Sequence, residues 1–327
     1  SQMHLDANAE IPGKLLRSRL GARRAQVQLR EVYLDETKQA TVKGQDMLKP
    51  FKRFYQDLYS VRAIDTSALD QLLESWQVDP AVWDGFTKDF TVPELMAAIK
   101  KCDPNKSPGT DGVGYGIYIE LAQELAPIYL AACNSVWQGN EKIPSSWLEA
   151  IIITLYKGKG DVKDLANRRP LTLLNCDYKL FAKMIAARLQ TVLQRIISPA
   201  QNGFVKDRKM HDNLFLLIEL LRTAEVEDDE YPLIALLDFV KAFDMIQHEA
   251  IAKILKHIHC PEQAIHFLMT ILTQRHACIL VNGWTTSYFN IQCGTGQGDP
   301  LSALPFNIAV EPLSQAIQKD PDAHGIT

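Results

Sequence analysis

The sequence predicts a mixed α/β (α+β) fold, because strand-like segments alternate with long amphipathic helices. Residues 151–155 and 232–239 are β-branched or apolar runs, which are typical of buried strands. Residues 177–197 carry apolar side chains at helical spacing. Asn282-Gly283, between two strand-like runs at 277–281 and 284–291, is the strongest hairpin signal in the chain.

The first ninety residues predict a helical N-terminal extension and linker. Residues 14–58 have apolar side chains at mixed helical spacings, with Gly44 as an interruption. Residues 61–90 are acidic and punctuated by Trp and Pro, and they predict a linker with a short helix at 67–76. Thr91-Val92-Pro93-Glu94 then matches a capping box, so a helix is expected from Thr91 to about Cys102.

The middle of the chain predicts a loop, two strands and several helices. Residues 103–112 are dense in turn formers, and the turn at 157–160 joins the strand within 147–156 to a returning strand at 169–174. Helices are expected at 115–125, 127–138, 177–197 and 210–224.

The last hundred residues predict a buried strand, two helices, a hairpin and a glycine-rich loop. The strand at 232–239 has Asp238 near its carboxyl end. Helices follow at 248–259 and 261–274, and the hairpin comes next. After Gly294–Gly298, Asp299-Pro300 predicts a helix start with an Asp cap.

The net charge of −4 over 327 residues hides an uneven distribution. Residues 156–209 hold 12 Lys and Arg against 4 Asp and Glu, whereas residues 210–327 hold 6 against 15. A basic stretch is usually a solvated helix face, but it also suits a surface that binds a polyanion. Charge alone leaves both interpretations open.

The cysteines and the apolar runs indicate the cellular compartment in which the protein is expected. Six scattered cysteines without a C-x-x-C pair suit a reducing environment rather than a disulfide framework. The apolar runs are too short to span a membrane, and no secretory signal is visible. We therefore expect an intracellular protein, nuclear or cytoplasmic, without a membrane partner.

Two carboxylates near the predicted strand invite different interpretations. Asp238 at a buried strand end needs a cation or hydrogen-bond donors, so a structural and a functional role are equally open. Asp244-x-x-Gln247 ahead of a helix favours a capping box. The Gly294–Gly298 loop alone predicts a tight turn; it matches neither a Walker loop nor a dinucleotide fingerprint.

Taken in order, five motifs resemble the reverse transcriptase domain of non-LTR (LINE-type) retrotransposons. Phe54-Tyr55 and Leu58-Tyr59 are also similar to the stretch that precedes that domain, so the resemblance covers roughly residues 45–327. The motifs are Lys106-Ser-Pro-Gly-Thr-Asp-Gly112, Asn167-Arg-Arg-Pro-Leu-Thr-Leu-Leu-Asn175 with Tyr178-Lys179, Gln201-Asn-Gly-Phe204 through Arg208, Leu237-Asp-Phe-Val-Lys-Ala-Phe-Asp244 and Gly294-Thr-Gly-Gln-Gly-Asp-Pro-Leu-Ser302.

The resemblance implies a right-hand polymerase fold. Residues 1–90 would be the N-terminal extension, 91–230 the fingers and 231–327 part of the palm. The implied activity is RNA-directed DNA polymerisation with an RNA template and a DNA primer. The implied cofactor is Mg²⁺, bound by Asp238 with the backbone carbonyl of Phe239 nearby.

Further roles follow from the resemblance. Lys157, Arg169, Phe243 and Gln297 would contact the incoming nucleotide, with the Phe243 ring as the steric gate against a ribose 2′-OH. The basic stretch and the glycine loop would contact nucleic acid mainly through phosphates, and the residues implied are Arg168, Lys179, Arg188, Arg208, Gly296 and Gly298.

Two departures from the family pattern stand out. Gly296 occupies the position where the family usually has Arg. The sequence stops at Thr327, before the strand expected to bring Tyr-x-Asp-Asp, and a two-metal site needs carboxylates from both strands. We therefore expect this chain alone to be inactive or nearly so. The alternative is a domesticated or degenerate module that binds RNA or a protein partner without catalysis.

Overall fold

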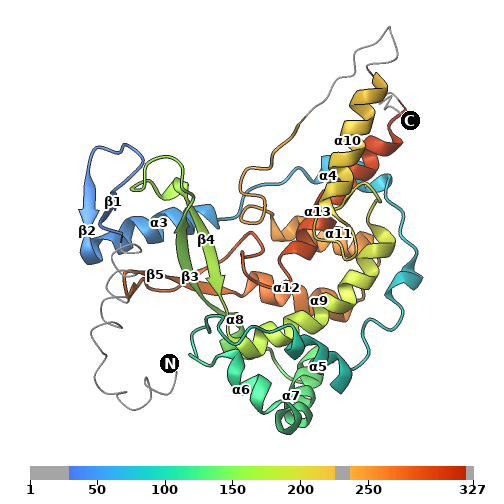
Figure 1. Cartoon of the computed structure of the whole chain (residues 1–327), viewed down its shortest axis with the longest axis horizontal. Coiled ribbons are helices and arrows are strands. Elements are labelled where there is room, and N and C mark those ends of the chain that lie inside the picture. Colours follow the sequence, from blue (N-terminus) through green and yellow to red (C-terminus); the bar gives the residue numbers. More distant parts are fainter. Residues whose placement is uncertain (1–28, 225–235, 322–327) are drawn as a thin grey trace.

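The protein is a mixed α/β molecule, as predicted, and a computed structural model describes residues 29–224 and 236–321 (Figure 1). A twisted sheet and a helix beside it occupy one side, and a helical body occupies the other. The strands are β1 (Glu31–Tyr33), β2 (Thr41–Lys43), β3 (Glu149–Tyr156), β4 (Arg168–Leu173), β5 (His276–Val281), β6 (Trp284–Thr285) and β7 (Phe289–Asn290).

The helices surround this sheet and make up most of the remaining structure. The α-helices are α3 (Leu48–Leu58), α4 (Thr66–Glu74), α5 (Val92–Lys100), α6 (Tyr115–Glu120), α7 (Ala122–Trp137), α8 (Ser145–Leu148), α9 (Cys176–Ile196), α10 (Met210–Ala224), α11 (His248–His257), α12 (Glu262–Thr273) and α13 (Ala303–Lys319). Short 3₁₀ helices cover Gly44–Met47, Pro80–Trp83 and Leu165–Asn167.

The main sheet has the strand order β4-β3-β5-β6, with β7 also paired to β5. β3 and β4 form an antiparallel hairpin in which Ile153 lies opposite Leu171 and Leu155 opposite Arg169. β3 and β5 are parallel, and the chain between them includes helices of the body. This pairing brings the two halves of the chain into one sheet.

Helix α9 lies at the centre of the body. Twelve of its side chains are buried, including Tyr178 and Phe181. Phe181 packs against Trp137, Phe90 and Phe267, each edge-on, with ring centroids 5.2–6.2 Å apart. These contacts join α7, α9 and α12 in one apolar core, which also includes Ile152 of β3 and Ala277 of β5.

Local signals in the sequence predict several elements well. Glu94 accepts a hydrogen bond from the Thr91 backbone N–H at 2.9 Å, which confirms the capping box at the start of α5. Asn282 and Gly283 both have positive φ, at 51° and 91°, as a two-residue hairpin turn requires. The strands at 151–155 and 169–174 and the helix at 177–197 are confirmed within a few residues.

The helix predicted over residues 14–58 is only partly correct. Residues 1–28 lie outside the described residues, and residues 48–58 form α3. Between them, β1 and β2 pair antiparallel with Val32 opposite Val42. The Val32 side chain is fully buried, and that tertiary contact decides the local conformation where mixed apolar spacing favoured a helix.

The buried strand predicted over residues 232–239 is wrong for its described part. Residues 236–239 form no ladder with a described strand, and Leu236, Leu237 and Phe239 are exposed. An apolar run specifies a preference for burial but not a pairing partner. Residues 232–235 lie outside the described residues.

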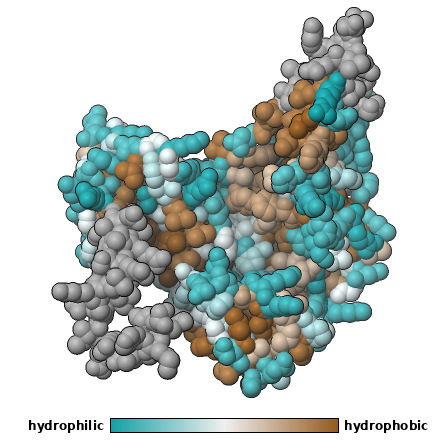
Figure 2. Space-filling view, in the orientation of Figure 1, coloured by the Kyte–Doolittle hydropathy of each residue, from teal (hydrophilic) through white to brown (hydrophobic). Residues whose placement is uncertain are grey.

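Helix α10 stands out from the body and carries a continuous apolar surface (Figures 1 and 2). Phe215 and Leu216 are 67% and 58% exposed. None of the helices in residues 29–224 and 236–321 combines the length and hydropathy of a membrane-spanning helix.

Candidate functional site

The β3–β4 hairpin presents two predicted cations on one face. Arg169 lies opposite Leu155, so these two side chains point to the same face of the hairpin. Lys157 comes two residues after Leu155, so its side chain also points to that face. Both side chains are exposed. Lys157 Nζ donates to the Ala166 carbonyl at 2.9 Å, so the ammonium is held at the turn.

Arg168 belongs to the opposite face. Its Nε donates to Thr154 Oγ1 at 2.9 Å, and a terminal guanidinium nitrogen donates to the Thr154 carbonyl at 3.1 Å. Burial lowers the pKa of the Arg168 guanidinium from its usual value. The side chain therefore cross-links the two strands of the hairpin and is only partly available to a ligand.

The glycine-rich loop lies along the outer edge of β4. The Thr172 N–H donates to the Gln297 carbonyl at 2.7 Å, so the loop occupies a position that another strand could take. Gly298 has φ +108°, and a Cβ there would lie 2.8 Å from the Thr172 carbonyl oxygen. This close approach requires glycine at position 298.

Gly296 is required for a different reason. It has φ +75°, which strains any residue with a side chain, but a Cβ there would lie 3.5 Å from Arg275 and Thr172. That distance is ordinary van der Waals contact. A residue with a side chain is therefore disfavoured at position 296 because of the positive φ, and not because its Cβ would clash with a neighbour.

A buried carboxylate links this loop to the segment that follows Asp238. Asp244 Oδ2 accepts a hydrogen bond from Gln297 Nε2 at 2.9 Å, and Oδ1 accepts one from the Tyr59 hydroxyl at 3.3 Å. Burial raises the pKa of Asp244 to about 6, against the lowering effects of Gln297, Tyr59, Lys241 and Lys157.

The capping box predicted at Asp244 is wrong. Helix α11 begins at His248 with Gln247 as its N-cap, and no side chain caps it. Gln247 Oε1 accepts instead from the Arg62 N–H at 2.9 Å. The signature Asp-x-x-Gln is local, whereas the contact between Asp244 and Gln297 is long-range, so sequence reasoning missed it.

A second buried group anchors the end of the loop. Asp299 Oδ2 accepts from the Tyr178 hydroxyl at 2.7 Å and lies 2.8 Å from an Arg275 guanidinium nitrogen. Arg275 and Asp299 are both buried. The helix cap predicted at Asp299 is displaced: its Oδ1 accepts from the Leu301 N–H, and α13 begins only at Ala303.

Phe243 forms part of an aromatic cluster beside the loop. Its ring centroid lies 4.9 Å from that of Phe306 and 5.6 Å from that of Phe204, and Phe239 also contacts Phe306. The Thr295 N–H donates to the Phe243 carbonyl at 2.8 Å. The half-buried ring is thus held from both sides.

Asp238 lies apart from these contacts, exposed ahead of a turn at Val240. Within the two described ranges, no three His, Cys, Asp or Glu side chains are grouped as metal ligands. A carboxylate and the Phe239 carbonyl are nevertheless hard oxygen donors, the class that Mg²⁺ prefers, and Mg²⁺ usually keeps several waters as further ligands. The donor chemistry of the pair therefore fits.

Three predicted nucleic-acid contacts are engaged within the protein. Lys179 is 9% exposed and donates to the Ser107 carbonyl at 3.1 Å. Arg188 forms a two-pronged ion pair with Glu94 at 2.6 and 3.0 Å. Arg208 donates to the backbone carbonyls of Gln201 and Ile197. Charge alone could not distinguish these cations, which bond within the protein, from cations that are free to bind a ligand.

The structure thus brings Gln297, Gly296 and Gly298 together with the β3–β4 hairpin, whose turn holds Lys157. Asp244, Tyr59 and the Arg275–Asp299 pair fix that arrangement, and the sequence alone indicated none of them as partners. The glycine loop is thus bonded to β4 through Thr172 on one side and to the Phe243 backbone through Thr295 on the other.

The chain is similar to known proteins over most of its length. A family model described as "Reverse transcriptase (RNA-dependent DNA polymerase)" matches residues 157–326. The chain is 30% identical over 283 residues to the Transposon TX1 uncharacterized 149 kDa protein of Xenopus laevis, covering 83% of this chain and 21% of that protein.

Two further relatives are polymerase proteins of mobile elements. The Retrovirus-related Pol polyprotein from type-1 retrotransposable element R2 of Popillia japonica is 27% identical, over 71% of this chain and 31% of its own length. The Probable RNA-directed DNA polymerase from transposon BS of Drosophila melanogaster is 26% identical, over 68% and 24%. The chain therefore spans about a fifth to a third of these relatives' lengths.

Proposed function

Because the chain belongs to the reverse transcriptase family, in the form found in non-LTR retrotransposons, we propose that it acts in RNA-templated DNA synthesis. The substrates of this proposal are an RNA template, a DNA primer and deoxynucleoside triphosphates, and the reaction takes place in the nucleus or cytoplasm. Residues 1–90 form the N-terminal extension, 91–230 the fingers and 231–327 part of the palm.

One observation carries the proposal: the glycine loop lies against β4, beside the cationic hairpin. The hydrogen bond from Thr172 to Gln297 fixes the loop relative to the strand that carries Arg169. Lys157 and Arg169 offer positive charge to the triphosphate, where charge develops as the phosphoryl group is transferred. Gln297, Gly296 and Gly298 present a flat surface for the nascent base pair.

The aromatic cluster supports a choice of sugar. Phe243 is packed against Phe204 and Phe306, so its ring cannot move aside easily. A fixed ring at the sugar position leaves no space for a 2′-OH. Phe243 is therefore the proposed steric gate for deoxynucleotides.

The proposed metal is Mg²⁺, held by Asp238 and the Phe239 carbonyl. When bound, the ion would neutralise phosphate charge during nucleotide addition. The family generally uses divalent metal ions, and the choice of Mg²⁺ rests on the hard oxygen donors of this pair.

The nucleotide-binding role of the hairpin can be tested in the complete open reading frame that encodes this chain. We expect Arg169→Gln to raise the KM for deoxynucleotide about tenfold in RNA-templated primer extension, by loss of one charge-assisted contact. Lys101→Gln removes the same charge from an exposed site on another part of the fingers and serves as the control. An equal KM in both variants would contradict the role of Arg169.

A further inference from the structure

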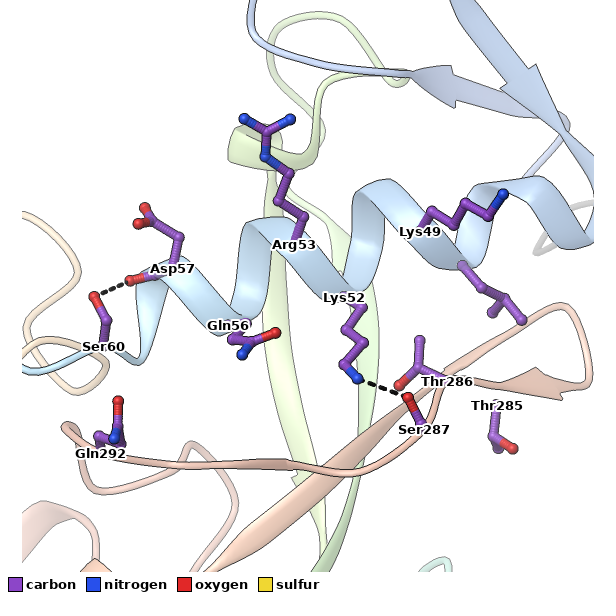
Figure 3. Close-up of a pocket in the computed structure, with 11 residues that line it drawn as sticks. Lys49, Lys52, Arg53, Gln56, Asp57, Ser60, Thr285, Thr286, Ser287 and Gln292 are labelled. Carbon is purple, nitrogen blue, oxygen red and sulfur yellow. Dashed lines mark hydrogen bonds between the residues drawn. The ribbon is translucent and has the colours of Figure 1, made fainter.

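We propose that the groove between α3 and residues 285–292 binds the sugar–phosphate backbone of a single nucleic acid strand. The groove is lined on one side by α3 and on the other by the chain from β6 to just beyond β7 (Figure 3). It is open to solvent and has a volume of about 770 Å³. This surface is separate from the glycine loop, and the proposal is independent of catalysis.

The helical wall follows from the two faces of α3. Phe51, Tyr55 and Leu58 are buried against the sheet and its surroundings. Lys49, Lys52 and Gln56 recur at helical spacing and line the groove. The apolar face holds the helix in place, which leaves the basic face for a ligand.

The two lysines are free to bind phosphate. Within residues 29–224 and 236–321, neither Lys49 nor Lys52 has a carboxylate within ion-pair distance, whereas the nearby Lys38 pairs with Asp164 at 2.6 Å. Among the described residues, Lys52 Nζ donates to the Ser287 hydroxyl alone, at 2.6 Å (Figure 3). Phosphate oxygens would replace water around these ammonium groups at little cost.

The opposite wall offers neutral hydrogen-bonding groups. Thr285, Ser287 and Gln292 are exposed along it, and the Gln292 backbone is fixed by a bond from its N–H to the Tyr59 carbonyl at 3.0 Å. Hydroxyl and amide groups bind phosphate and sugar oxygens in protein–nucleic acid interfaces. Because these groups are neutral, they would not form ion pairs with the carboxylates of an acidic protein.

The dimensions favour a strand over a small anion. The lining residues on the helical side run from Leu48 to Ser60, a length of about 18 Å. Lys49 and Lys52 lie about one turn apart, so they can contact successive phosphates along one strand. Asp57 is the single acidic residue in the described lining, and it lies towards one end.

The test is oligonucleotide binding by the 327-residue chain, measured by fluorescence anisotropy across a series of salt concentrations. The groove variant is Lys49→Gln/Lys52→Gln. The matched control is Lys100→Gln/Lys101→Gln, which removes two exposed charges at the end of α5. Single-stranded RNA and single-stranded DNA of one sequence are compared, and circular dichroism checks the fold of each variant.

We expect the groove variant to bind about tenfold more weakly and to lower the slope of log K against log salt by about 1.4, or 0.7 for each phosphate contact. The control should match the parent chain. Tighter binding of RNA than DNA would identify contacts to the 2′-OH, and equal binding would identify the phosphates alone.

Three results would overturn the proposal: no oligonucleotide binding by the parent chain, unchanged binding by the groove variant, or an equal loss in the control. None of these depends on nucleotide addition. If Arg169→Gln changes the KM while the groove variant binds normally, the proposed function stands and the groove proposal fails.

Discussion

Gln297 Nε2 donates a hydrogen bond to Asp244 Oδ2 at 2.9 Å, across 53 residues of sequence. The bond joins the glycine loop to the segment that carries Asp238 and Phe243. The Tyr59 hydroxyl, at the end of α3, donates to the other carboxylate oxygen. Three distant segments therefore meet at one buried carboxylate, and its protonation state affects all of them.

This carboxylate predicts a pH dependence of stability. Burial raises the pKa of Asp244 to about 6, from 3.8, so the folded state retains a proton that the unfolded state releases. Its contribution to stability is complete below the unfolded pKa and is lost as the pH rises through about 6. The shift corresponds to about 2–3 kcal/mol.

The Asp244→Asn variant isolates this effect. It cannot ionise, so its free energy of unfolding in urea should fall less than that of the parent chain as the pH rises from about 4 to about 7. Tyr59→Phe, which removes one bond but keeps the carboxylate, serves as the comparison. Parallel pH profiles for the Asn variant and the parent would contradict the assignment to Asp244.

Arg188 is expected to stabilise the packing of α9 against residues 86–94 and not to bind nucleic acid. Its guanidinium pairs with Glu94, donates to the Phe86 carbonyl at 2.9 Å and lies 3.8 Å from the centre of the Phe90 ring. Arg188→Lys should lower the free energy of unfolding by about 2–3 kcal/mol, because lysine cannot reproduce the fork. Oligonucleotide affinity of the folded variant should be unchanged; a selective loss of affinity without destabilisation would assign Arg188 to the interface.

The buried pair of Arg275 and Asp299 should be essential for folding of the loop region. Arg275→Met leaves the Asp299 carboxylate with the Tyr178 hydroxyl as its one side-chain donor among the described residues, and we expect a loss of about 3–5 kcal/mol. The double variant Arg275→Met/Asp299→Leu removes both charges and should recover part of that loss. Urea unfolding of the two variants measures the difference, and an equal loss in both would argue against an ion pair.

Phe243 should control the choice of sugar. Phe243→Val opens space beside the Phe204 and Phe306 rings, so ribonucleotides should enter more readily. The ratio of kcat/KM for deoxynucleotide over ribonucleotide is expected to fall about tenfold or more in primer extension by the complete open reading frame. The control is Phe306→Leu, which alters a ring that packs against Phe243 but leaves the Phe243 ring in place. An unchanged ratio for Phe243→Val would show that Phe243 is not the steric gate.

Local sequence signals predicted much of the fold. The Asn282-Gly283 turn and the Thr91–Glu94 capping box depend on neighbouring residues, and the structure confirms both. The hairpin at residues 31–43 was missed because burial of Val32 overrides a weak helical pattern. The strand over 236–239 was predicted from hydropathy alone, which carries no information on pairing.

The candidate site was less predictable. The resemblance implied that Lys157, Phe243 and Gln297 contact the incoming nucleotide, but the contacts that organise the surrounding structure join residues far apart in the sequence. The Tyr59–Asp244 and Tyr178–Asp299 contacts span 185 and 121 residues. Lys179 was predicted to contact nucleic acid as part of the basic stretch, yet it lies on the largely buried α9 and is only 9% exposed.

The most direct test of the account is RNA-templated primer extension with Mg²⁺ by the complete open reading frame that encodes these residues. We predict extension with deoxynucleotides that Asp238→Asn abolishes, while the exposed control Asp320→Asn, at the end of α13, retains it. Absence of extension by the parent protein, or full activity of the Asp238→Asn variant, would contradict the proposed function.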